Sequence, residues 1–125
     1  MRLLLHTHLF LWAVADSRRL KAAVRRQMLA AAKIYVSAAS IWEIAIKARL
    51  GKIQGDPARL AQAIGDSGFV ELPVSVEHAA RVAQLPLHHN DPFDRLLIAQ
   101  AATEPLLLLT ADATLAKYGE LVKLV

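Results

Sequence analysis

Short apolar runs, each ending at a polar residue, alternate along this chain with segments of helical character. The apolar runs cover residues 3–5, 34–36, 69–72 and 106–109, and residues 122–125 form a weaker edge candidate. Runs of this length are typical of strands that are buried on both faces of a sheet. Because helical segments separate them, the pattern predicts βα units around a parallel sheet. We therefore expect an α/β fold with helices covering both faces.

The helical segments are predicted from their caps and their apolar spacing. Ser17 is expected to cap a helix whose apolar positions are spaced by four, four and three residues, and Gly51 is expected to end another. Asp56 and Asp91 each precede a proline, which is typical of a helix start. The expected helices cover residues 9–14, 17–31, 38–50, 56 onward, 75–85, 91–102 and 112–118.

The composition limits the class of protein. With 125 residues, of which 55% are hydrophobic and 21% charged, the chain is expected to form a single domain over residues 1–125 rather than a disordered segment. The absence of cysteine excludes disulfides, zinc–thiolate sites and thiol catalysis, and it fits an intracellular, cytoplasmic protein. No apolar stretch is long enough to span a membrane, so we expect no membrane association.

Charge is distributed unevenly along the chain. Residues 1–62 contain eleven lysines and arginines against three acidic residues, whereas residues 63–125 contain four against eight. The basic half, including the arginines between residues 18 and 26, is suited either to a polyanion such as RNA or to a solvated helix face. Glycine-rich motifs that cradle phosphate groups are absent, which argues against a nucleotide-binding protein.

Polar residues follow several of the predicted strands and should meet at one edge of the sheet, where α/β proteins bind ligands. These residues are His6, Thr7, Ser37 and Thr110, with Glu43, Asp91, Asp94 and Asp112 on the segments that follow or precede strands. Glu43, Asp94 and Asp112 would form a carboxylate cluster with little nearby positive charge. Such a cluster is costly unless it binds a hard divalent cation.

Each acidic residue also has a structural interpretation. Ser40 and Glu43 match a capping box, and Glu43 could pair with Lys47 one helical turn later. Asp91, Asp94 and Asp112 could cap helices or complement helix dipoles. The adjacent residues His88 and His89 are expected to be solvated in a polar loop.

Four segments of the chain together resemble the PIN-domain ribonucleases, and within them the VapC toxins of bacterial toxin–antitoxin modules. These segments are LLLHTH (3–8), VSAASIWEIAIK (36–47), HHNDPFDRLLIAQA (88–101) and TADATLAKYG (110–119). The resemblance implies a three-layer α/β/α sandwich around a central parallel sheet of four to five strands. It also implies an endoribonuclease that uses Mg²⁺ or Mn²⁺ to hydrolyse RNA, an antitoxin partner, a homodimer, and an apolar groove in which the antitoxin lies.

The resemblance assigns the acidic catalytic and metal site to Glu43, Asp94 and Asp112, with Asp91 close by, and it includes position 6. The family has Asp at that position, whereas this chain has His6. Imidazole is a poor ligand for Mg²⁺ and a better one for Mn²⁺, Zn²⁺, Co²⁺ or Ni²⁺. The side chains expected to bind substrate are Thr7, Ser40, Lys47, Arg49, Arg95 and Thr110.

Two functions therefore follow from the sequence. The first is a metal-dependent endoribonuclease toxin whose activity is impaired by His6. The second is a catalytically inactive PIN-fold module that binds an antitoxin or RNA. We expect His6 to face the three acids, either as a charged counter-ion that excludes Mg²⁺ or as a neutral ligand of a transition metal.

Overall fold

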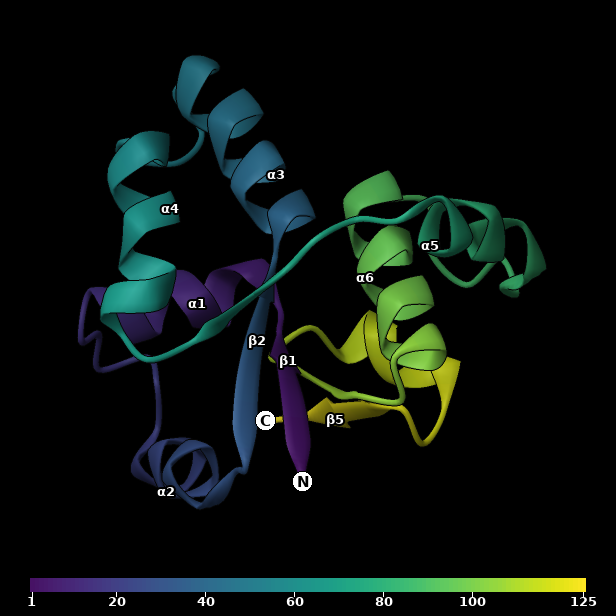
Figure 1. The fold of residues 1–125 in the computed structure, drawn as a ribbon, viewed down its shortest axis with the longest axis horizontal. Coiled ribbons are helices and arrows are strands. Elements are labelled where there is room, and N and C mark those ends of the chain that lie inside the picture. Colours follow the sequence, from purple (N-terminus) through teal and green to yellow (C-terminus); the bar gives the residue numbers. More distant parts are fainter.

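The first apolar run of the chain forms the central strand of a five-stranded sheet in the computed structural model, which describes residues 1–125 (Figure 1). The strand order is β3-β2-β1-β4-β5, and every neighbouring pair is parallel. The strands are β1 (Arg2–Leu5), β2 (Lys33–Ser37), β3 (Val70–Leu72), β4 (Leu107–Thr110) and β5 (Val122–Leu124). The predicted α/β class and parallel sheet are confirmed.

Helices cover both faces of this sheet. Figure 1 shows α1, α2 and α4 on one side of the strands and α5 and α6 on the other. The helices are α1 (Thr7–Val14), α2 (Ala22–Ala30), α3 (Ala38–Arg49), α4 (Pro57–Asp66), α5 (Val76–Arg81) and α6 (Pro92–Thr103), with 3₁₀ segments η1 (Val82–Gln84) and η2 (Ala113–Tyr118). None of the helices has the length and apolar character that a membrane span requires.

The side chains of the central strands divide between two cores, one on each face of the sheet. Leu3 and Leu5 belong to the core beneath α1, whereas Leu4 belongs to the core beneath α6. On β4, Leu109 and Leu108 divide in the same way. This alternation follows from the two-residue period of a strand, and it explains why the runs are continuously apolar.

Most predicted helix caps are present. The side chains of Asp56, Asp91 and Ser75 accept hydrogen bonds from the first turns of α4, α6 and α5, respectively. Ser37 Oγ accepts from Ala39 N at 3.0 Å and caps α3. Gly51, which follows α3, has a φ of 73°, the left-handed conformation that favours glycine.

The predicted cap at Ser17 is wrong. The helix α2 begins five residues later, after Lys21, and Ser17 Oγ accepts a hydrogen bond from Arg19 N instead. The cause lies in Arg25, whose guanidinium donates to Ser17 O at 2.8 Å and to Asp16 Oδ1 at 2.7 Å. These contacts hold the preceding segment as a turn, so residues 17–21 do not join the helix.

The strand order creates a crevice at the carboxyl ends of β1 and β4. The chain moves from β1 outward through β2 to β3, then returns to place β4 on the other side of β1. Connections therefore leave the two neighbouring strands β1 and β4 in opposite directions. In open α/β sheets this is the point where ligands bind.

Candidate functional site

A cleft of about 390 Å³ opens at this crevice. Its residues come from the ends of β1 and β4, from α1 and α3, and from the start of α6. They are His6, His8, Trp12, Glu43, Lys47, His89, Asp91, Asp94, Ala111 and Asp112. The acids that the sequence singled out thus lie around one cleft, together with three histidines and a lysine.

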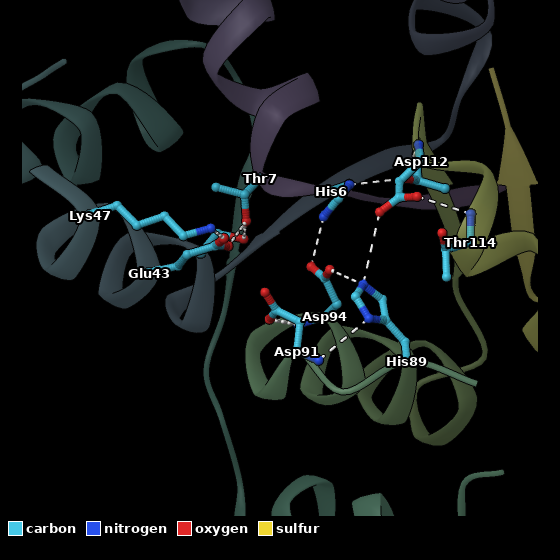
Figure 2. Close-up of polar contacts among 11 residues, drawn as sticks. His6, Thr7, Glu43, Lys47, His89, Asp91, Asp94, Asp112 and Thr114 are labelled. Carbon is cyan, nitrogen blue, oxygen red and sulfur yellow. Dashed lines mark hydrogen bonds and ion pairs between the residues drawn. The ribbon is translucent and has the colours of Figure 1, made fainter. Parts of the chain in front are cut away.

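His6 lies at the end of the central strand and directs its ring into the cleft (Figure 2). It occupies the residue before α1, but its side chain makes no capping bond there. His6 Nε2 is 2.8 Å from Asp94 Oδ1, and Nδ1 is 2.8 Å from Thr110 Oγ1. Both ring nitrogens are therefore held, and His6 contacts one of the three acids directly.

Asp94 is the most closely held of the acids. Asp91 Oδ1 accepts from Asp94 N at 3.0 Å, so Asp91 caps α6 and positions the backbone of Asp94. Burial raises the pKa of Asp94, but the hydrogen bond and charge of His6, followed by the charges of His89 and Lys47, outweigh it. The pKa of Asp94 consequently lies below its usual value, and the carboxylate is ionised.

His89 belongs to the cleft, contrary to the expectation that it would be solvated. Its Nε2 is 3.0 Å from Asp94 Oδ2 and 3.9 Å from Asp112 Oδ2. The ring is partly buried, whereas that of the adjacent His88 is exposed and packs against Tyr118. No periodicity in this loop distinguishes the two histidines, so the inward position of His89 could not be predicted from the sequence.

Glu43 forms a second group in the cleft with Lys47 and Thr7, apart from Asp94 in Figure 2. Lys47 Nζ is 2.5 Å from Glu43 Oε2, and Thr7 Oγ1 donates to Glu43 Oε1 at 2.7 Å. Burial lowers the pKa of Lys47, but the hydrogen bond and the charge of Glu43 raise it by more than burial lowers it. The pKa of Lys47 therefore lies above its usual value. The predicted Glu43–Lys47 pair is therefore present.

The capping box predicted at Ser40 and Glu43 does not form. Ser37, three residues earlier, caps α3, and Glu43 therefore lies inside the helix, 2% exposed. Ser40 Oγ is 3.0 Å from Thr7 Oγ1 instead. A capping box does occur in the chain, but at Ser75.

The remaining residues predicted to bind substrate differ in how deeply they are buried. Thr110 is fully buried, and its Oγ1 accepts from Asp112 N at 3.0 Å. The guanidinium of Arg95 donates to the carbonyls of Pro86 and Val82. Arg49 is exposed in the last turn of α3.

His8 and Trp12 line the cleft although the sequence analysis assigned neither to the site. They lie one helical turn apart on α1, and their rings meet edge to face at 6.4 Å. Burial and the charge of His6 lower the pKa of His8, which keeps this imidazole neutral near neutral pH. Two aromatic side chains four residues apart on a helix share one face, and this helix starts directly after a strand end. That pattern is the signal that could have indicated them.

The donor set of the cleft does not fit the Mg²⁺ ion that the sequence resemblance implies. Mg²⁺ requires oxygen ligands in near-ideal octahedral geometry. Here both oxygens of Asp94 face imidazole nitrogens, and both oxygens of Glu43 are bound by Lys47 and Thr7. The nitrogen-containing side chains occupy the contacts that such an ion would need.

Comparisons with known proteins agree with this architecture. The chain superposes on the toxin–antitoxin complexes VapBC2 from Rickettsia felis (TM-score 0.68, 14% identity, 100% of this chain and 98% of that chain) and VapBC from Salmonella typhimurium (0.67, 14%, 94% and 91%). It also superposes on a toxin–antitoxin complex from Klebsiella pneumoniae (0.66, 19%, 96% and 94%). No curated protein matches the sequence significantly. The sequence profile of the PIN domain matches residues 3–121, and the chain therefore belongs to the PIN domain family.

Proposed function

We propose that this chain is the nuclease-fold toxin of a toxin–antitoxin module, with endoribonuclease activity that is impaired by His6. The single observation that carries the proposal is the contact of His6 with Asp94 at the centre of the acidic cleft. In PIN ribonucleases, carboxylates in such a cleft hold divalent cations that activate water against a phosphodiester. The fold, the family and the gathered acids support the nuclease origin, and the nitrogen groups support the impairment.

The acids and their neighbours have distinct proposed roles. Glu43, Asp94 and Asp112 are the proposed acidic set, and Asp91 holds Asp94 through the helix cap. Lys47 and the exposed Arg49 are the proposed contacts to RNA phosphates, because both lie in the last turns of α3 at or near the cleft.

An RNA cleavage assay tests this function. We expect the unmodified chain to cleave a mixed RNA substrate slowly or not at all with Mg²⁺ or Mn²⁺, and the His6→Asp variant to cleave it. The variant His6→Asp combined with Asp94→Asn is the matched control and should be inactive. Equal cleavage by the unmodified chain and by His6→Asp would show that position 6 does not limit activity.

A second function, binding without catalysis, is favoured by the same contacts. Nitrogen groups already contact both oxygens of Asp94 and one oxygen of Glu43, so these two carboxylates are engaged without any cation. If His6→Asp also fails to cleave RNA while it remains folded, the chain is better described as a PIN-fold module that binds an antitoxin or RNA.

We propose an antitoxin partner that lies in the groove beside the cleft. This groove, of about 530 Å³, shares His8 and Trp12 with the cleft and continues along α1 past apolar residues such as Val14. Arg19 and Lys52 also line it, so an apolar segment with acidic flanks is complementary. Val14→Glu should abolish co-elution with the co-expressed partner of the module in gel filtration, whereas Leu29→Glu on α2 should not.

We further propose a homodimer formed through α3. Trp42, Ile46 and Leu50 form a stripe along this helix, and all three are exposed, with Trp42 packed edge to face on Phe93 at 5.0 Å. A stable dimer is expected to bury more than about 1,000 Å². Light scattering should give a dimer mass for the unmodified chain and a monomer mass for Trp42→Glu, and a monomer in both would contradict the proposal.

A further inference from the structure

The cleft contains one cluster of ligand atoms that differs in kind from the carboxylate set of a Mg²⁺ nuclease. His89, Asp94 and Asp112 each offer one atom, and the three atoms lie within 4.8 Å of one another (Figure 2). We propose that these three residues form a binding site for Zn²⁺ or a similar divalent transition metal ion. This inference goes beyond the proposed nuclease function, because it concerns which ion the cleft takes whether or not RNA is cleaved.

Each of the two carboxylates has one oxygen held by the protein and one oxygen directed at His89. Asp94 Oδ1 contacts His6, which leaves Oδ2 at 3.0 Å from His89 Nε2. Asp112 Oδ1 accepts from Thr114 N at 2.9 Å, which leaves Oδ2 at 3.9 Å from the same nitrogen. The structure therefore presents two carboxylate oxygens and one imidazole nitrogen to a common point.

The spacing of these atoms suits a small ion. A tetrahedral Zn²⁺ ion at ~2.0–2.2 Å from its ligands places them about 3.3–3.6 Å from one another. The two separations from His89 Nε2, 3.0 and 3.9 Å, bracket this range, and all three ligand atoms lie within 4.8 Å of one another, so side-chain rotations can bring them to an ion. Three protein ligands with an open fourth position are typical of zinc sites that face a cleft.

The ligand type selects the class of ion. Imidazole nitrogen binds Zn²⁺, Co²⁺ and Ni²⁺ well, and it binds Mg²⁺ poorly. Two carboxylates supply the charge that balances a divalent cation. The site thus lies towards the His89 loop, away from the Glu43–Lys47 pair, and it selects against the ion that the family uses.

His6 positions a ligand in this arrangement. Because Thr110 Oγ1 accepts from Asp112 N, its own hydrogen is available to His6 Nδ1. His6 Nε2 then donates to Asp94 Oδ1 and turns Oδ2 towards His89. A hydrogen bond of this kind to a ligating carboxylate commonly strengthens metal binding.

One contact must open when the ion binds. His89 Nδ1 accepts from Asp91 N at 3.4 Å, and Nε2 therefore carries the ring proton while no ion is bound. Binding through Nε2 moves that proton to Nδ1 and ends this contact. The contact is long and weak, so its loss costs little against a metal–nitrogen bond.

Titration calorimetry on the full chain tests the site with Zn²⁺, Mn²⁺ and Mg²⁺ chlorides. We expect one Zn²⁺ per chain, tighter binding of Zn²⁺ than of Mg²⁺, and at least about tenfold weaker Zn²⁺ binding by His89→Gln. His88→Gln, which changes the neighbouring exposed histidine, is the matched control and should bind as the unmodified chain does. Circular dichroism should show both variants to be folded, which separates loss of the site from loss of the fold.

Co²⁺ provides a readout that is independent of activity. The Co²⁺-loaded chain should show visible absorption bands of a site with nitrogen and oxygen ligands, and these bands should be lost in His89→Gln and kept in His88→Gln. The proposal is overturned if the unmodified chain binds no Zn²⁺, if Mg²⁺ binds more tightly, or if both variants bind Zn²⁺ equally. None of these results depends on whether His6→Asp cleaves RNA, so the two proposals fail separately.

Discussion

Replacing His6 by Asp should destabilise the protein when no metal is present. His6 and Asp94 are 6% and 5% exposed, and their contact is 2.8 Å long. Loss of a hydrogen bond to a charged group costs about 1.5–3 kcal/mol. A second carboxylate at about 5 Å adds about 3 kcal/mol of repulsion at an effective dielectric constant of about 20, and proton uptake by one carboxyl limits this addition. We therefore expect the free energy of unfolding to fall by about 3–5 kcal/mol.

Urea unfolding in the presence of a chelator measures this loss, and repeating it with Mg²⁺ measures its recovery. The His6→Asp variant restores an oxygen donor, so Mg²⁺ at about 100 times its Kd should return about 2.7 kcal/mol. His6→Asn is the control: it removes the imidazole without adding charge, and it should lose less stability and gain nothing from Mg²⁺. If His6→Asp in chelator is as stable as the unmodified chain, the His6–Asp94 contact contributes nothing to the free energy of unfolding, and the reasoning fails.

Three further predictions concern stability. Thr7→Val removes the hydrogen bond to buried Glu43 and should lower the free energy of urea unfolding by about 1–3 kcal/mol, whereas Thr7→Ser should stay close to the unmodified chain. Because the pKa of Asp94 is held below 3.8 in the folded state, its ionisation contributes stability above that pH. The difference in unfolding free energy between the unmodified chain and Asp94→Asn should therefore be constant above about pH 5 and shrink towards about pH 2, and a difference that grows on acidification would contradict this sign. Leu108→Ala, in the fully buried middle of β4, should cost about 2–5 kcal/mol by thermal or urea unfolding, while Leu29→Ala at an exposed position should change stability by less than about 0.5 kcal/mol; similar values for the two would contradict the burial argument.

The elements of this fold could be predicted where local chemistry and tertiary packing agree. The run at residues 3–5 is apolar because the central strand is buried on both faces, and that requirement is visible in the sequence. Asp56 and Asp91 begin helices because an acidic cap followed by proline satisfies the helix terminus locally. Such signals depend on neighbours in the chain and can be recognised without the structure.

Two predicted helix starts were wrong although the residues there have the chemistry of a cap. Ser17 has the chemistry of a cap, but Arg25 binds its carbonyl and delays α2. Ser40 and Glu43 have the spacing of a capping box, but Ser37 begins the helix one turn earlier. Local spacing alone does not show that α2 starts after Lys21 without a side-chain cap, or that Ser37 rather than Ser40 caps α3.

The gathering of the acids and His6 at one cleft could be predicted from the sequence, but the position of His89 could not. Asp94 and Asp112 were indicated because they follow strand or helix boundaries at one edge of the sheet. His89 and His88 are adjacent in a loop without periodicity, and only the path of that loop turns the first towards Asp94 and the second towards Tyr118. Loop paths depend on contacts with the rest of the fold.

The position of β1 at the centre of the sheet has a consequence for synthesis and refolding. One edge of β1 pairs with β2, which emerges from the ribosome soon afterwards, but its other edge pairs with β4, with Leu3 opposite Leu107. Until nearly the whole chain has been made, a strand of leucines keeps a row of unpaired backbone groups, which is a template for intermolecular pairing. Nascent or partly refolded chains should therefore aggregate at concentrations where the finished protein is stable, and slow dilution at low protein concentration should improve recovery from denaturant.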